Sequence, residues 1–361
     1  MAIRFYKPAL YRKDMDAVLQ TMVDEKIGPG ERKKEFLKTF ASYIGKKDGI
    51  ALRSYPDAIS SSLEALGLEE GDGVLVSVLS PRIYLDVIKR QGLKAIIIDT
   101  DENGLPSLAD AEKKLDENPK AFLYFEPICQ IPDSISGIKD LGIPVIEDIS
   151  QSLGSSYGDE PSSEEESDDS SSEDEKSSVQ AGDIGNIVIS EFEENGVIST
   201  GGGAAAVTSD EDLADKLKKS VASLSPYIDL PDMNAALGIV QLSKAEMLLE
   251  RRNMIYRTFV QAQQKSGAKL FGSSSPLFKA NGHSFSVIVE TKPDEAIEFS
   301  QKHGVSSKRT FTQSIGVRYQ DKYDRFPNAI AAITRAISFP LYPFLAKSEI
   351  ESIQRVISHL G

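Results

Sequence analysis

Short apolar runs alternate with helical patterns along much of the chain. From residue 49 onward, runs rich in Val and Ile are separated by stretches whose apolar positions recur at helical spacing. Such runs are typical of buried parallel strands that are joined by helices. The predicted strands are 49–52, 73–78, 95–99, 121–126 and 144–148, with helices at 57–66 and 84–91. The pattern therefore predicts an α/β fold with a mostly parallel sheet.

The pattern changes in the second half of the chain. Two further strands, at 186–190 and 204–208, are predicted without a preferred direction, and helices follow at 209–221 and, as one long helix, at 232–266. After residue 267, a strand at 284–290 is mixed with helices at 294–303 and 348–360. We therefore predict a large domain at 1–240 and a smaller α+β domain at 241–361, which the long helix leads into.

Charge is concentrated in one segment of the chain. Of the 361 residues, those from 158 to 178 include ten acids, one lysine and many serines, while the whole chain carries a net charge of −14. A segment with no apolar residue cannot offset the entropy lost on ordering, so we predict a disordered insertion. It is either a solvated insertion or a segment for phosphorylation or partner binding. Its acidity argues against nucleic acid as a partner.

Several classes of protein are disfavoured by what the sequence lacks. No apolar stretch approaches the length of a membrane span, and the first residues lack the apolar region of a signal peptide. We expect a soluble cytoplasmic protein without membrane contact. Cys129 is the single cysteine, and the three histidines all lie in the last quarter of the chain. An internal disulfide is therefore excluded, and we expect no metal site.

Ligands of open parallel sheets bind beyond the carboxyl ends of the strands. The segments that follow the predicted strands are therefore the candidates for a binding site. These are residues 53–56, 79–82, 126–129, 147–151 and 190–195.

A series of motifs runs along the chain in a characteristic order. They are Gly28-Pro-Gly30, residues 36–45, 65–72 (ALGLEEGD) and 92–99, Glu147-Asp148-Ile-Ser-Gln151-Ser-Leu-Gly154, residues 182–185, 201–203 and 234–238, and the closing SFPLYP at 338–343. Together they resemble the DegT/StrS-type sugar aminotransferases, which are fold-type I pyridoxal phosphate enzymes acting on nucleotide-linked keto sugars. The resemblance implies a three-layer large domain, a smaller C-terminal domain and a homodimer.

The resemblance also implies a lysine that holds pyridoxal phosphate as a Schiff base. Its position falls between Glu193 and Gly196, and this chain has no lysine from residue 177 to residue 215. Some family members carry histidine there, but no histidine precedes His283. We therefore predict no catalytic residue of the family type. Whether a lysine from elsewhere, such as Lys308, approaches the site is left open.

Other cofactor contacts of the family are changed or kept. Its phosphate-binding SGT is replaced by Ser54-Tyr55-Pro56, where proline lacks an N–H and tyrosine obstructs a phosphate, so Ser54 and Tyr55 are at most vestigial contacts. Pro56 equally suits simple helix initiation. Asp148 matches the residue that pairs with the pyridine nitrogen, and Gln151 the residue that reaches the ring hydroxyl. Alternatively, Asp148 caps the strand end or the following helix, and Gln151 lies on a solvated turn.

Three hypotheses follow. The first is a family member without transaminase activity that acts as a ligand-binding or regulatory protein, with a nucleotide sugar or an active paralogue as its partner. The second is a non-standard enzyme that holds pyridoxal or pyridoxamine phosphate without a covalent bond, with Asp148 fixing the ring and Glu193, Glu194 or water as the base. The third is a scaffold whose acidic segment recruits a basic partner.

Overall fold

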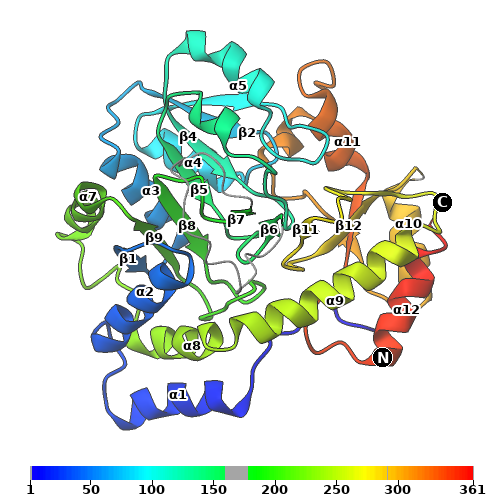
Figure 1. Ribbon diagram of the computed structural model, residues 1–361, viewed down its shortest axis with the longest axis horizontal. Helices are drawn as coiled ribbons and strands as arrows, with labels where there is room; N and C mark the ends of the chain where they lie inside the picture. Colours follow the sequence, from blue (N-terminus) through cyan, green and yellow to red (C-terminus); the bar gives the residue numbers. More distant parts are fainter. Residues whose placement is uncertain (1, 159–177, 291, 361) are drawn as a thin grey trace, which may run out of the picture.

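The computed structural model describes residues 2–158, 178–290 and 292–360, so the predicted acidic insertion lies, except for its two end residues, outside the described part. A seven-stranded sheet of order β1-β9-β8-β5-β4-β2-β3 forms its centre (Figure 1). Its strands are β1 (Asp48–Leu52), β2 (Gly73–Ser77), β3 (Lys94–Ile98), β4 (Pro119–Phe125), β5 (Val145–Asp148), β8 (Ile187–Glu191) and β9 (Ala204–Thr208).

The sheet is mixed but mostly parallel, as predicted. The pairs β2–β3, β2–β4, β4–β5 and β5–β8 are parallel. Strand β9 runs antiparallel to both of its neighbours, β8 and β1. The sequence left open the directions of the strands at 186–190 and 204–208. In the structure, β8 runs parallel to β5, and β9 is the reversed strand of this sheet.

Helices cover both faces of the sheet, which makes three layers. Val74 and Val76 of β2 pack in one cluster with Ala58 and Tyr84, whereas Leu75 between them packs on the other side with Ile138. Successive strand residues point to opposite faces, so both faces of this sheet are buried. One face carries α3 (Tyr55–Ala65), α4 (Ile83–Arg90) and α7 (Glu211–Val221), and the other α2 (Glu31–Tyr43), α5 (Leu108–Lys114), α6 (Ser136–Lys139) and α8 (Asp232–Leu242).

A second, antiparallel sheet of order β10-β12-β14-β13 lies in the C-terminal part of the chain. Its strands are β10 (Lys269–Leu270), β12 (Phe285–Ile288), β13 (Lys308–Arg309) and β14 (Ala336–Phe339). Its accompanying helices are α9 (Ala245–Gln263), α10 (Pro293–Lys302), α11 (Pro327–Arg335) and α12 (Lys347–Ile357). The chain begins against this sheet, because Ile3 forms a bridge with Val305. The domain boundary at residue 240 stays a prediction.

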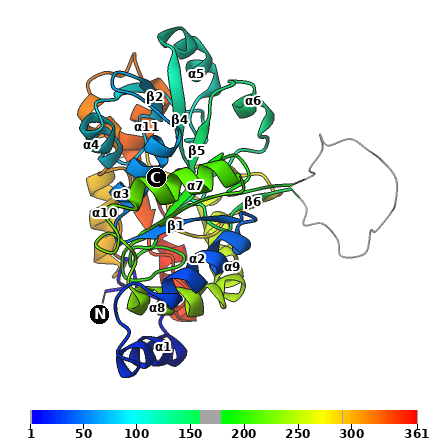
Figure 2. The same cartoon turned by 90° about the vertical axis from the view of Figure 1, so that its left-hand side faces the viewer.

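The remaining elements are short or peripheral. Helix α1 (Arg12–Val23) lies beneath α8, away from both sheets (Figures 1 and 2). A small three-stranded sheet combines β6 (Ser156–Tyr157), β7 (Val179–Gln180) and β11 (Phe278–Lys279). Two 3-10 turns, η1 (Leu115–Glu117) and η2 (Ile315–Tyr319), complete the described elements.

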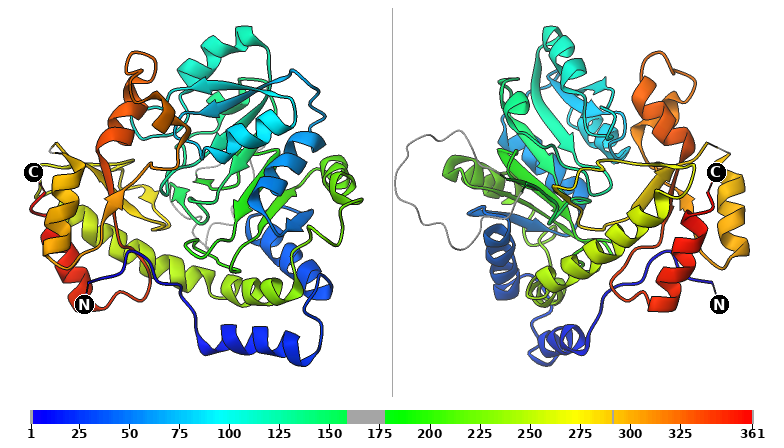
Figure 3. Two further views of the ribbon diagram at one scale, coloured as in Figure 1. Left: turned by 180° about the vertical axis from the view of Figure 1, so that it is seen from behind. Right: turned by 45° about the vertical axis from the view of Figure 1, so that its right-hand side comes forward.

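The prediction of one long helix at 232–266 is wrong. The chain forms two helices that follow each other, α8 and α9, as Figure 3 shows from behind. Between them, the Ser243 hydroxyl donates to the Val240 carbonyl (2.8 Å), and the Lys244 ammonium binds the buried carboxylate of Asp14 (2.6 Å). A serine that bonds to the backbone weakens a helix locally, and the ion pair with α1 fixes the break.

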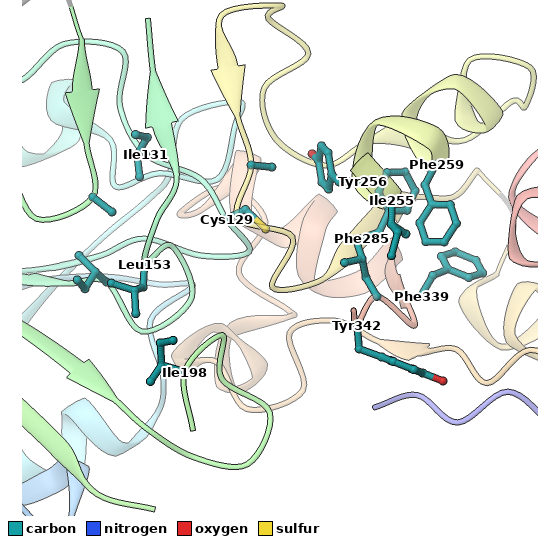
Figure 4. Packing of buried hydrophobic residues seen from close by; sticks show 14 of the residues in the cluster. Cys129, Ile131, Leu153, Ile198, Ile255, Tyr256, Phe259, Phe285, Phe339 and Tyr342 are labelled. Atoms are coloured by element: carbon teal, nitrogen blue, oxygen red, sulfur yellow. The ribbon is translucent and has the colours of Figure 1, made fainter. Parts of the chain in front are cut away.

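The hydrophobic core continues from the large sheet to the second one. Figure 4 shows Cys129 and Leu153, from loops beside the large sheet, on one side and Phe259, Phe285 and Phe339 on the other. The Cys129 side chain is fully buried, and burial raises the pKa of its thiol to about 11. The two sheets therefore share one packed interior.

Candidate active site

Asp148, the last residue of β5, is the centre of the candidate site. Its side chain is fully buried. The backbone N–H of Ser150 donates to Oδ1 (2.9 Å), and the Ser150 hydroxyl donates to the same oxygen. The hydroxyls of Tyr55 and Tyr84 both donate to Oδ2. A carboxylate offers about four lone-pair positions, so these four donors saturate Asp148.

Tyr55 reaches Asp148 because of how α3 begins. Ser54 is the N-cap: its backbone is extended, and its side chain accepts from the Asp57 N–H (3.3 Å). Pro56 stands in the first turn, where its missing N–H costs nothing, so the interpretation as helix initiation is confirmed. Tyr55 is thereby the first helical residue, and its side chain is buried against the sheet.

Tyr84 is the member of this site that the sequence analysis missed. It lies on α4, fully buried, and its ring packs edge-on against Phe125. Its hydroxyl oxygen lies 3.3 Å from that of Tyr55. A tyrosine on the apolar face of a predicted helix usually has a buried acceptor, and this signal could have pointed to an acid at a strand end.

Gln151 holds a turn in the described structure. Its side-chain oxygen accepts from the backbone N–H of Ile128 (2.9 Å), and its backbone carbonyl accepts from Cys129 N–H (3.1 Å). Ile128 and Cys129 both have positive φ angles, 48° and 70°, which are uncommon for such side chains. Gln151 therefore stabilises the strained turn after β4, and its contact with a cofactor stays a prediction.

The segment between β8 and β9 is the one in which the resemblance places the lysine. The Phe192 carbonyl accepts from the N–H groups of both Thr200 (3.1 Å) and Gly202 (3.0 Å), which closes the segment into a loop. Glu193 and Glu194 are exposed on this loop. The described residues from 178 to 215 include no lysine. The sequence also left open whether Lys308 approaches this site. In the structure, its ammonium lies 4.0 Å from the ring centroid of Phe5.

Acidic groups accumulate beside Asp148. Burial raises the pKa of Glu191, at the end of β8, to about 7, and the charges of Asp148 and Glu193 add to the effect. Burial also raises the pKa of Asp148, while the hydrogen bonds from Ser150 and the two tyrosines act in the opposite direction. An incoming dianion would therefore meet negative potential here.

The neighbouring acid of the same motif has a structural role. Glu147 is buried and accepts from three backbone N–H groups, those of Gly182 (2.6 Å), Ile184 (2.9 Å) and Gly185 (2.6 Å). Residues 182–185 are one of the motifs that the sequence analysis singled out. The carboxylate thus fixes this loop against the end of the sheet.

No group of three or more His, Cys, Asp or Glu side chains in the described part could hold a metal ion. No helix among the described residues is both long and apolar enough to span a bilayer.

Known proteins resemble this chain in sequence and in fold. The chain is 24% identical to GDP-perosamine synthase of Escherichia coli O157:H7, over 96% of this chain and 95% of the relative. The structure resembles the aminotransferase TlmJ of Streptoalloteichus hindustanus, with a TM-score of 0.85, 19% identity, and 99% and 97% of the two chains covered.

The fold also resembles that of Escherichia coli GDP-4-keto-6-deoxy-D-mannose-3-dehydratase, which was solved with bound hydrated PLP. The TM-score is 0.82 at 16% identity, and 99% and 100% of the two chains are covered. The family model for the DegT/DnrJ/EryC1/StrS aminotransferases matches residues 8–360. The chain therefore belongs to the DegT/DnrJ/EryC1/StrS aminotransferase family.

Proposed function

We propose that this family member has lost the Schiff-base transaminase chemistry and serves as a binding or regulatory protein in nucleotide-sugar metabolism. Its relatives include a GDP-perosamine synthase, which supports a nucleotide sugar as the class of ligand. The observation that carries the proposal is the saturation of Asp148 by side chains of the protein itself.

A pyridine ring would need one oxygen of Asp148 as the acceptor for its N–H. Both oxygens already accept two hydrogen bonds each, and the donors at Oδ2 are two buried tyrosines. A cofactor could bind Asp148 only if these hydroxyls moved away and lost a charge-assisted bond. The residues of this chain therefore do not fit the ring of pyridoxal phosphate.

The position for a phosphate is also altered. A helix N-terminus attracts anions through its free N–H groups and its dipole. At α3, Pro56 supplies no N–H, and the Asp57 carboxylate stands in the first turn, where it accepts from the Ser54 hydroxyl (2.6 Å). A negative side chain thus stands at the helix end where a phosphate would bind.

One observation favours the alternative of a non-covalent cofactor enzyme. Glu191 is partly buried beside Asp148, and its pKa, raised to about 7, suits a general base near neutral pH. On this alternative, pyridoxamine phosphate would bind without a lysine and Glu191, rather than Glu193 or Glu194, would accept the proton. The test below separates the two.

We also propose a homodimer, as the resemblance implies. Helix α1 supports it, because it packs a polar face inward and exposes an apolar one. Asp14 and Thr21 are buried, whereas Met15, Leu19 and Met22 are between 54% and 60% exposed. Exposed apolar residues at helical spacing mark an interaction surface.

The decisive experiment is a titration of the full-length protein with pyridoxal 5′-phosphate. We expect no absorbance band in the imine region, at roughly 400 to 430 nm, and no stoichiometric adduct by mass spectrometry after borohydride reduction. A single lysine carrying one adduct per chain would overturn the proposal.

Pyridoxamine phosphate tests the alternative, since it needs no lysine. Its binding would be followed by calorimetry in the wild type and in Asp148→Asn. Binding that the substitution abolishes would support the non-covalent enzyme. Absence of binding in the wild type, together with binding of a nucleotide sugar, is the outcome that we expect.

A further inference from the structure

A groove lined by lysines lies between α2 and α7, over the edge strand β1. The ribbon of these three elements can be followed in Figure 1. The volume of the groove is about 740 Å³, and it lies near the start of β1, whereas the candidate active site centres on Asp148 at the end of β5. The lysines that line this groove come from two helices, α2 and α7, and from the turn before β1. They are Lys33, Lys34, Lys38, Lys47 and Lys218.

The acids of the groove neutralise only part of this charge. Lys33 pairs with Asp229 (2.9 Å) and Lys218 with Asp48, and Lys34 binds Glu31 outside the groove (2.8 Å). Lys38 and Lys47 are exposed and make no ion pair with any described residue. A positive patch of this kind on a chain of net charge −14 attracts a strongly acidic group.

The chain itself contains such a group. Residues 159–177 include ten acids and one lysine. The residues that flank them, Gly158 and Ser178, line a cavity of about 370 Å³ together with Tyr43 and Ile44, at the C-terminal end of α2. The acidic segment thus leaves and re-enters the described structure beside the helix that carries Lys33, Lys34 and Lys38.

Chain length allows contact within one molecule. Nine or so extended residues reach roughly 30 Å from an anchor, at about 3.4 Å each. Lys38 lies six residues before Ile44, about 9 Å along the helix, and Lys47 lies three residues after Ile44. Both lysines are therefore within reach of acids in the middle of the segment.

We propose that residues 159–177 dock onto the lysines of this groove in the same chain, with Lys38 and Lys47 as their main partners. The attraction is electrostatic and lies near the surface, so it weakens as salt screens it over about 10 Å or less. This inference concerns a surface separate from the candidate active site around Asp148 and does not depend on the proposed function.

Zero-length cross-linking of the full-length protein tests this inference. A carbodiimide joins a lysine to a carboxylate that contacts it, and peptide mass spectrometry locates the bond. We expect cross-links from residues 159–177 to Lys38 and Lys47 at several times the yield at Lys216 and Lys219, which are exposed on α7 outside the groove. The yield should fall several-fold between low salt and about 0.5 M salt.

A matched pair of variants completes the test. Lys38→Gln with Lys47→Gln should remove most cross-links to the segment, whereas Lys216→Gln with Lys219→Gln should leave them. Equal yields at all exposed lysines would overturn the inference. So would cross-links formed only between light and heavy isotope-labelled copies, because the occupant would then be a second chain.

Discussion

Tyr55 and Asp148 are 93 residues apart in the chain, yet the Tyr55 hydroxyl donates to Oδ2 of the Asp148 carboxylate. Both side chains are buried. Tyr84 donates to the same oxygen. The carboxylate that the family resemblance assigns to a cofactor is thus held by the protein itself, and the first prediction follows from this contact.

Tyr55→Phe should destabilise the protein. The substitution keeps the ring but removes one donor to a buried carboxylate, which costs about 1–3 kcal/mol. Urea unfolding followed by circular dichroism measures the change. Tyr227→Phe is the control, because that side chain is 83% exposed. Its substitution should change the free energy of unfolding by no more than about 0.5 kcal/mol. Equal stability of the Tyr55 variant and the wild type would contradict the assigned bond.

The raised pKa of Glu191 predicts how stability depends on pH. Its pKa is about 7 in the folded protein and ordinary in the unfolded chain, so the folded state binds a proton more tightly. The stability it contributes is therefore present at low pH and lost as the pH rises from about 4.5 through 7. Glu191→Gln should remove this loss.

The measurement is urea unfolding of wild type and Glu191→Gln at pH 5 and pH 8. The variant should gain about 1–3 kcal/mol relative to the wild type between the two pH values. Glu64→Gln, at an exposed position of α3, should show no such gain. A difference that is the same at both pH values would show that Glu191 titrates normally.

Asp14 should anchor helix α1. Its buried carboxylate accepts from the Lys244 ammonium (2.6 Å), the Gln241 amide (2.9 Å) and the Tyr11 N–H (2.7 Å). Asp14→Ala leaves these donors unpaired and should cost about 3 kcal/mol or more. Asp16→Ala on the same helix should cost little, because the side chain of Asp16 is 62% exposed.

Urea unfolding measures the loss in the free energy of unfolding for both variants. Hydrogen exchange shows whether the backbone amides of α1 lose protection in Asp14→Ala. Similar losses for the two variants would argue against the anchoring role.

The exposed face of α1 should mediate the proposed homodimer. Met15→Glu combined with Leu19→Glu places two charges on this face and should convert a dimer to a monomer in sedimentation equilibrium. Leu277→Glu, at a position that is 50% exposed in another part of the molecule, should leave the mass unchanged. A wild type that sediments as a monomer would rule out the homodimer itself.

The sequence by itself determined the positions of most strands of the large sheet and the family. The strands at 73–77, 94–98 and 187–191 were predictable because buried parallel strands form short apolar runs, a purely local signal. The absence of a lysine near Glu193 is likewise a property of the sequence. Pro56 after Ser54 predicted a helix start, because fixed backbone geometry and a missing N–H suit that position.

The tertiary structure alone decided which side chains meet. Tyr84 joins Asp148 across 64 residues, and Lys244, which lies between α8 and α9, binds Asp14 across 230 residues. The lysines of α2 and α7 converge on one groove only because both helices flank β1. Such contacts depend on strand order and on how helices pack, and hydrophobic periodicity carries neither, since it records only which face of an element is buried.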